Sequence, residues 1–342
     1  MRNIKNTKKK GFLKKIFIKI CRILGYEIID QNNLYLPVLE KNSNQNLSSL
    51  GKNSISISLG EIKITRPVKS LDIIVKTCTS VNLVTQSKQR VFEEKKSEYT
   101  FRTIKSLLSS IKFNNDIFKK IDLKFTIIDH GSSKEDLSII NDYLKNSLIE
   151  YEIINLNMRE FSSIKTIDKN NPIIEENMKA TMASILKSFK IIKENSADLV
   201  YFVEDDYIHK KDSLCEMIFA YEKFASAFKQ ELFLCPADYP YLYKSLENTN
   251  ILIGNNYHWR TIKESLLTFM TSKRMIDKHW DNLNKMCEIE HSPFETLLHK
   301  IYEEEICLSP IPSLAMHCTN VNSVFGLSPN INWKKIWEDN KV

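Results

Sequence analysis

Glycine is scarce in this chain of 342 residues, which contains only seven glycines. No glycine-rich phosphate loop and no G-x-S-x-G segment occurs, which argues against a P-loop nucleotide hydrolase and against a serine hydrolase of the nucleophile-elbow type. The histidines also lack the H-E-x-x-H spacing of a helical zinc site. The chemistry of this protein must therefore come from side chains that the fold brings together.

Paired cysteines and long apolar runs are lacking as well. The seven cysteines are scattered, odd in number and without a C-x-x-C pair, which argues against a disulfide framework or a zinc ribbon. No segment approaches the 18 or more consecutive apolar residues of a membrane-spanning helix, and lysines interrupt the only candidate for a signal peptide. We therefore expect a protein of the reducing cytoplasm.

Acidic residues are missing from the first 24 positions, which hold nine lysines and arginines. This arm accounts for the net charge of +7, because removing its nine bases from the total of 49 leaves 40 against 42 acidic residues. A near-neutral body with one basic arm is not the charge distribution of a basic nucleic-acid-binding domain. We therefore expect no nucleic-acid partner.

Residues 12–24 have the pattern of an amphipathic helix. At about 100° per residue, the apolar side chains fall within one arc of roughly 140° and the basic ones fall opposite, with only Ile18 violating the division. One interpretation is a helix that holds the protein on the anionic inner face of the cell membrane through residues 11–25. The other is a helix that docks on the protein's own body with a solvated basic face.

The composition predicts four segments along the chain. Residues 1–26 form the basic amphipathic helix, and residues 27–70 form a linker or irregular segment, because positions 41–56 are polar with few apolar side chains. Residues 71–325 form the main domain, and residues 326–342 form a C-terminal tail.

From residue 71 onward, strand and helix patterns alternate. Short runs rich in β-branched residues predict buried strands, and apolar residues at helical spacing predict the helices between them. This alternation predicts an α/β fold with a mixed, mostly parallel sheet flanked by helices, in which ligands bind beyond the carboxyl ends of the strands. The predicted strands cover 71–77, 123–128, 151–156 and 199–203, and the predicted helices cover 99–111, 137–144 and 177–193.

Two of the predicted strands end in acidic residues. The second ends at Asp129, and the fourth runs into Glu204, Asp205 and Asp206. Three adjacent carboxylates at the edge of a sheet repel one another, and a divalent cation or a hydrogen-bonded sugar hydroxyl would offset this repulsion. Carboxylate oxygens together with substrate phosphates are typical of a Mn²⁺ or Mg²⁺ site. The alternative is a solvated acidic turn that precedes the next helix.

The order and spacing of these segments resemble the GT-A glycosyltransferases, especially their family-2-like group, over residues 71–325. The resemblance rests on the strand LDIIVKT, the helix SEYTFRTIKSLLSSI, the strand and turn FTIIDHGSS, and the segment LVYFVEDDY. Members of that group usually carry D-x-G-S after the second strand and D-x-D or E-D-D after the fourth. The resemblance implies a GT-A, Rossmann-like fold and a nucleotide-sugar donor.

The resemblance also implies roles for the residues at the strand ends. Asp129 would bind the nucleotide base, Asp205 would face the ribose or the diphosphate, and Asp206 would coordinate Mn²⁺ or Mg²⁺. Thr77, at the end of the first strand, and Glu204 would belong to the same nucleotide-sugar site. Because Glu204 stands where a literal D-x-D has aspartate, the division of labour among the three acids stays open.

Two later residues extend the resemblance. Glu295 begins a helical run, where inverting GT-A enzymes carry an acidic catalytic base, and His317 follows a proline-containing segment from which a histidine often reaches the metal in this family. Glu290 and Glu264 are alternative candidates for the base. The structural alternatives are a first-turn carboxylate stabilised by the helix dipole and a histidine packed in an apolar strand.

Aromatic and charged residues between these segments complete the predicted donor site. Asp238 and Tyr239 follow the strand LFLC, and Trp259 and Arg260 come later. Arg260 could hold a diphosphate through two parallel donors, and the two aromatic rings could pack on a sugar face. Ordinary packing of a loop rich in tyrosine and proline is the alternative.

These features predict a metal-dependent, inverting transfer of a sugar from a nucleoside-diphosphate donor to a hydroxyl of a glycan or of a lipid-linked acceptor, as in surface-polysaccharide assembly. Two alternatives stay open. One is a nucleotidyltransferase that makes the nucleotide-sugar, although its glycine-rich, lysine-containing loop is not evident. The other is a catalytically silent GT-A-like protein that binds glycan or acts as a scaffold.

Overall fold

The chain forms two units, Met1–Lys63 and Ile64–Val342, and each is described by itself. The first contains helix α1 (Phe12–Ile23), as the apolar periodicity predicts. In the described part of the chain, no helix combines the length and the apolar character needed to cross a bilayer. The polar segment 41–56 lies outside the described residues. The computed structural model describes residues 12–26, 63–80, 91–167, 170–195, 197–243, 246–318 and 331–341.

Strands of the second unit build a sheet of nine and a separate ribbon of two, counted over the described residues. They are β1 (Ser70–Thr77), β2 (Asp122–Asp129), β3 (Glu150–Asn155), β4 (Leu199–Glu204), β5 (Tyr207–His209), β6 (Phe233–Leu234), β7 (Ile251–Ile253), β8 (His258–Thr261), β9 (Phe269–Ser272), β10 (Cys307–Ile311) and β11 (Ala315–His317). The sheet has the order β3-β2-β1-β4-β9-β6-β10-β8-β7, and β5 pairs with β11 in the ribbon.

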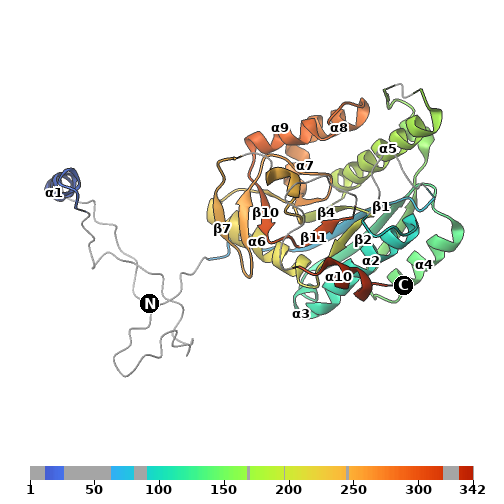
Figure 1. The fold of residues 1–342 in the computed structure, drawn as a ribbon, viewed down its shortest axis with the longest axis horizontal. Coiled ribbons are helices and arrows are strands. Elements are labelled where there is room, and N and C mark those ends of the chain that lie inside the picture. Colours follow the sequence, from blue (N-terminus) through green and yellow to red (C-terminus); the bar gives the residue numbers. More distant parts are fainter. Residues whose placement is uncertain are drawn as a thin grey trace. The chain divides into compact units, whose positions relative to one another are not determined.

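Helices flank the sheet on both faces (Figure 1). The predicted fold class is therefore confirmed: a mixed α/β domain with a largely parallel sheet between helical layers. The helices are α2 (Lys96–Phe113), α3 (Asn115–Phe118), α4 (Lys134–Lys145), α5 (Pro172–Glu194), α6 (Ser213–Phe228), α7 (Lys273–Lys278), α8 (Trp280–Glu288), α9 (Thr296–Glu304) and α10 (Trp333–Asp339), with short 3-10 turns at Met158–Phe161 and Pro240–Tyr243.

Alternate residues of the central strands face two separate apolar layers. Leu71, Ile73 and Val75 of β1 pack in a cluster with residues of α2, α4 and α6, whereas Ile74 packs in a cluster with residues of α5, α8 and α9. The alternation follows from the two-residue period of a strand. Because both faces are buried, β1 is a nearly continuous apolar run, which is typical of a parallel strand covered by helices. Figure 1 shows α5, α8 and α9 on one side of the sheet and α2 and α4 on the other.

The parallel strands bring their carboxyl ends to one edge of the sheet. Thr77 of β1 is level with Asp129 of β2, and Lys76 is level with Glu204 of β4. β4 and β6 both run antiparallel to β9, and β10 runs parallel to β6, so β4, β6 and β10 share one direction. The loops after these strands therefore emerge where ligands of α/β sheets bind.

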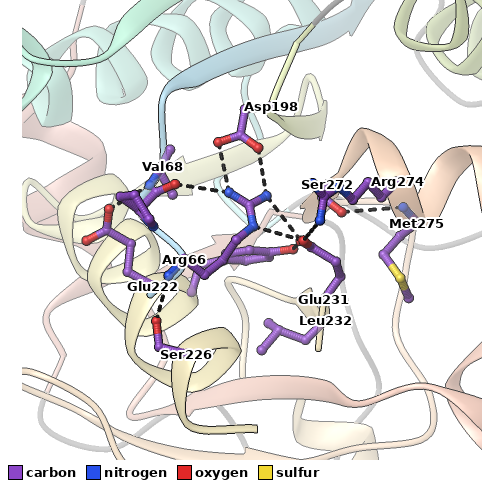
Figure 2. A network of polar contacts seen from close by, with 12 residues as sticks. Arg66, Val68, Asp198, Glu222, Ser226, Glu231, Leu232, Ser272, Arg274 and Met275 are labelled. Atoms are coloured by element: carbon purple, nitrogen blue, oxygen red, sulfur yellow. Dashed lines mark hydrogen bonds and ion pairs between the residues drawn. The ribbon is translucent and has the colours of Figure 1, made fainter. Parts of the chain in front are cut away.

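Arg66 fastens the start of the second unit to the sheet (Figure 2). Its guanidinium donates to both carboxylate oxygens of Asp198, at 3.0 and 2.6 Å, and to both of Glu231, at 2.8 and 3.1 Å. The backbone N–H of Arg66 donates to Ser226 Oγ at 3.0 Å. Residues 64–70 therefore belong to the compact unit rather than to the linker that the composition predicts, because their polar groups find partners far along the chain.

The C-terminal segment also packs on this unit. Trp333 and Trp337 of α10 are buried, and the ring of Trp337 lies stacked 4.3 Å from that of Phe92. The guanidinium of Arg102 lies 4.1 Å from the centre of the Trp337 ring, and its Nη1 donates to the Trp337 carbonyl at 2.6 Å. Within the predicted tail, the described residues therefore form a packed helix, and positions 326–330 lie outside them.

We expect Arg66→Met to lower the free energy of unfolding by about 2–3 kcal/mol, because it leaves two partly buried carboxylates without their counter-ion. Urea unfolding followed by tryptophan fluorescence measures the change. Arg274→Met is the matched control: Arg274 also contacts Glu231, at 3.4 Å, but its side chain is 80% exposed. The control should change stability by less than about 0.5 kcal/mol, and equal losses in both variants would contradict the anchoring role of Arg66.

Candidate active site

Asp129 ends β2 and lies in the turn that leads to α4. Its carboxylate accepts hydrogen bonds from Thr77 Oγ1 (2.7 Å), Ser132 Oγ (2.5 Å) and Ser132 N (3.2 Å). Gly131 has a φ of +83°, which residues with a side chain rarely adopt, so the turn favours glycine at this position. Two of the predicted nucleotide contacts, Thr77 and Asp129, are thus hydrogen-bonded to each other and buried at the β1–β2 edge.

Asp205 is held by three donors from other elements. Lys96 Nζ lies 2.5 Å from its Oδ1, and its Oδ2 accepts from Thr100 Oγ1 at 2.8 Å and from Cys78 N at 3.1 Å. Lys96 and Thr100 lie on α2, and Cys78 follows β1. Asp205 is 8% exposed, so the contacts of both oxygens are made within the protein. This geometry is that of an anchor between α2 and the turn after β4.

Asp206 lies beside His317, as the resemblance implies. Their closest atoms, Asp206 Oδ1 and His317 Nε2, are 3.3 Å apart. The ribbon places them together, because Tyr207 pairs with His317 across β5 and β11, and their rings stack 4.6 Å apart. The backbone carbonyl of Asp206 accepts from Cys318 N at 2.7 Å. Burial lowers the pKa of His317, but Asp206 and Glu204 outweigh it and the net direction is upward.

Glu204, the first acid of the triplet, forms an ion pair with Lys76 of β1. Lys76 Nζ lies 2.9 Å from Glu204 Oε1, and both side chains are mostly buried. Burial lowers the pKa of Lys76, but Glu204, Asp205 and Asp206 together raise it above its ordinary value. Lys76 therefore carries its charge, and each of the three adjacent acids has a basic partner of its own.

Glu295 lies directly before α9 and is half-buried. Burial raises the pKa of its carboxyl, a hydrogen bond from its own backbone N–H lowers it, and the charge of Glu204 raises it; the net direction is upward. Lys76 acts on Glu295 in the opposite sense. Glu204 and Lys76, at the carboxyl ends of β4 and β1, are therefore among the charges that act on Glu295.

The two alternative bases occupy different environments. Glu290 is 7% exposed, and its Oε2 accepts from the backbone N–H of Ile167 at 2.9 Å. The backbone N–H of Glu290 also donates to the carbonyl of Lys165, so Glu290 holds two segments of the chain together. Glu264 is exposed. Of the three candidates, Glu295 alone is half-buried, and the pKa of its carboxyl is raised.

Asp238 and Arg260 pair with each other. Arg260 Nη2 donates to Asp238 Oδ1 at 2.7 Å, Tyr243 OH donates to Asp238 Oδ2 at 2.5 Å, and the guanidinium lies 4.4 Å from the centre of the Tyr243 ring. Burial raises the pKa of Asp238, although Tyr243 and Arg260 oppose this effect. Within the described part of the chain, Arg260 Nε is buried and makes no hydrogen bond.

The predicted aromatic sugar contacts lie in the core instead. Trp259 is 0% exposed, and its indole N–H donates to Glu216 Oε1 at 3.2 Å. Tyr239 is 1% exposed, and its hydroxyl lies 2.8 Å from that of Tyr207. Neither ring offers a face to a sugar. Strand alternation in β8 explains the difference for Trp259, because it turns this residue into the apolar cluster and its neighbour Arg260 away from it.

Lys76, Lys96 and Thr100 are the site residues that sequence reasoning missed. Lys76 lies inside the apolar run LDIIVKT, where a buried charged side chain requires a partner. Its position in the sequence therefore indicates an acidic partner at the end of this strand. Lys96 is one of several lysines in an unremarkable polar segment. Its pairing with Asp205, 109 positions away, depends on the docking of α2 against the sheet.

The donor types at this edge fit a divalent cation only together with a substrate. No group of three or more His, Cys, Asp or Glu side chains able to hold a metal occurs over the residues that the structure describes. Asp206 and His317 supply two donors. Two protein donors suit an ion that takes its remaining ligands from phosphate oxygens and water, as Mg²⁺ does in phosphate-transfer sites.

We expect Lys96→Met to destabilise the protein by about 2–4 kcal/mol, because it leaves the buried charge of Asp205 without a counter-ion. Thermal and urea unfolding measure the change. Lys112→Met on the same helix is the matched control, since Lys112 is exposed, and it should leave stability within about 0.5 kcal/mol. A neutral effect of Lys96→Met would refute the anchor described for Asp205.

Known proteins offer only distant similarities to this chain. No protein-family model matches the chain, and a search of curated proteins finds no similar sequence. Among solved structures, the chain is similar to the galactosyltransferase LgtC in complex with donor and acceptor sugar analogues (10% identity, 69% of this chain and 72% of that chain covered, TM-score 0.37). It is also similar to TarS of S. aureus in complex with UDP (13% identity, 70% and 57% covered, TM-score 0.39) and to UTP-bound UGPase from Acinetobacter baumannii (8% identity, 79% and 93% covered, TM-score 0.39). Similarities of this extent concern the fold alone, and they support no assignment of activity.

Proposed function

We propose that this chain transfers a sugar from a nucleoside-diphosphate donor to a hydroxyl of a glycan or of a lipid-linked acceptor, as in the assembly of a surface polysaccharide. The observation that carries the proposal is the pairing of Asp206 with His317 after β4, at the sheet edge where Thr77 and Asp129 also pair. Asp206 lies beside His317, which suits a cation bound to a diphosphate. Glu295, whose pKa burial and the charge of Glu204 raise, is assigned as the general base. Glycosyl transfer to a hydroxyl requires both functions.

The nucleoside end of the donor is assigned to the β1–β2 edge. Asp129 would accept a hydrogen bond from the base, and Thr77 and Ser132 orient its carboxylate for this role. Asp205 is assigned as a positioning residue, because both of its oxygens are engaged by α2 and by the residue after β1. It would fix the turn that carries Asp206 rather than contact the ribose.

The diphosphate is assigned to the neighbourhood of Asp206 and His317. These two residues would hold Mn²⁺ or Mg²⁺, and the imidazole favours Mn²⁺, because Mg²⁺ prefers oxygen ligands. When bound, the ion neutralises the charge on the departing diphosphate. Arg260 is the candidate for a direct phosphate contact. Asp238 accepts a hydrogen bond from one nitrogen of its guanidinium and thereby orients the group. Its Nε has no hydrogen-bond partner among the described residues and could bind a phosphate oxygen.

The acceptor is assigned to the side of Glu295. Its carboxylate would take the proton of the attacking hydroxyl on the face opposite the diphosphate, and such an arrangement inverts the anomeric centre. Burial raises the pKa of this carboxyl, so it binds a proton more readily than an exposed glutamate does. The positive charge of Lys76 acts against this rise and favours the ionised form that a base requires.

Asp206→Asn is expected to abolish Mn²⁺-dependent donor binding while leaving the fold intact. A panel of nucleotide-sugars, each tested by thermal shift with and without Mn²⁺, measures this, since a donor at 100 times its Kd stabilises by about 2.7 kcal/mol. Asp116→Asn, whose side chain is 97% exposed, is the control and should bind donor normally. Unchanged turnover in Asp206→Asn would show that Asp206 does not bind the metal. Release of pyrophosphate from a nucleoside triphosphate and a sugar 1-phosphate would indicate a nucleotidyltransferase instead.

Glu295→Gln is expected to lower kcat by roughly 10²–10⁴-fold with little change in donor affinity, because a general base acts only in the chemical step. The pH profile gives a second readout. The base must be deprotonated, so wild-type kcat should fall as the pH drops through its raised pKa, and this acidic limb should be absent from the residual activity of Glu295→Gln. Glu264→Gln, at an exposed position, is the control. Loss of donor binding in Glu295→Gln would make this residue a nucleotide contact.

A further inference from the structure

Helix α1 presents apolar side chains to solvent along its whole length. Phe17 is 60% exposed and Ile20 is 49% exposed, and the other members of the apolar arc are similar. In the described part of the chain, no other helix has this many exposed large apolar residues, and here they line one side of a single helix. A contiguous apolar surface of this kind marks a contact site. Its members are Phe12, Leu13, Ile16, Phe17, Ile20, Ile23 and Leu24.

The opposite side of α1 is basic and also exposed. Lys15, Lys19 and Arg22 are exposed, and Lys14 belongs to the same arc by its position in the sequence. No acidic residue occurs among residues 1–24, so no negative charge on this segment competes for the lysines. The helix therefore combines an apolar stripe with a cationic stripe, and its partner must accommodate both at once.

The stability of the isolated helix does not account for this apolar surface, because α1 has only 12 residues. Isolated helices of this length are marginal in water, and most helical stability in proteins comes from packing of the apolar face. Its length of about 18 Å is too short to cross the hydrocarbon core, which is about 30 Å thick. A second copy of the helix would bury the apolar stripe but would leave the basic stripes on the outer sides without a negative partner.

We propose that α1 lies in the plane of an anionic lipid surface, with its apolar stripe among the acyl chains and its lysines and Arg22 at the lipid phosphates. A helix that lies at the boundary between acyl chains and anionic headgroups has the apolar chains on one side and the negative headgroups on the other. One helix can therefore contact both through its two opposite stripes. Long basic side chains can extend toward the headgroups while their methylene groups stay in apolar surroundings. The inference rests on α1 alone and is independent of the proposed transferase activity.

Co-sedimentation of the full chain with vesicles tests this proposal. Vesicles of phosphatidylcholine with phosphatidylglycerol should bind the protein, and vesicles of phosphatidylcholine alone should bind it much less, with the difference reduced by salt. Phe17→Glu should weaken binding to the anionic vesicles by about 10-fold or more, because it places a charge in the acyl region. Lys19→Gln should weaken it by about fivefold.

Phe113→Glu is the matched control, since Phe113 is 63% exposed on the second unit, close to the 60% of Phe17. It should leave vesicle binding unchanged. Equal binding by wild type and Phe17→Glu, or equal loss in both phenylalanine variants, overturns the proposal. A lower thermal stability of the second unit in Phe17→Glu would assign the stripe to the protein's own body. A smaller mass in solution for Phe17→Glu than for wild type would assign it to a second copy.

Discussion

The buried charge of Asp205 is the constraint on which the rest of the candidate site depends. A carboxylate that is 8% exposed is costly unless donors surround it, and here Lys96, Thr100 and the backbone of Cys78 do so. These donors belong to α2 and to the residue after β1, so satisfying one charge fixes one helix, two strand ends and the turn after β4. The positions of the flanking acids follow, because Glu204 and Asp206 are its immediate neighbours in the chain.

Charge balance at this edge explains how three consecutive acids can coexist. Lys76 pairs with Glu204, Lys96 with Asp205, and His317 with Asp206. A turn of three unpaired carboxylates would repel itself, and the raised pKa values of Lys76 and His317 reflect the same attraction from the side of the bases. The three pairs differ in burial: the side chains of Lys96 and Asp205 are the least exposed of the three pairs, and those of Lys76 and Glu204 are the most exposed.

The two helical layers contribute different halves of the site. The anchor of Asp205 comes from α2, which packs in one apolar cluster, whereas Glu295 precedes α9, which packs in the other. The sheet separates the clusters, and the loops at the carboxyl ends of its strands lie between the two layers.

The sequence by itself determined the alternation of strands and helices, the acidic strand ends and the amphipathic character of α1, because periodicity and strand-end chemistry are local properties. It did not show that residues 64–70 pack on the second unit or that Trp259 is buried, and it left Lys76 and Lys96 out of the site. Only the tertiary structure decided these points. The partners of Arg66 and Lys96 lie more than 100 positions away, and the choice of face for Trp259 depends on which strand β8 joins. Burial and pairing at such separations are set by the packed fold and not by local sequence.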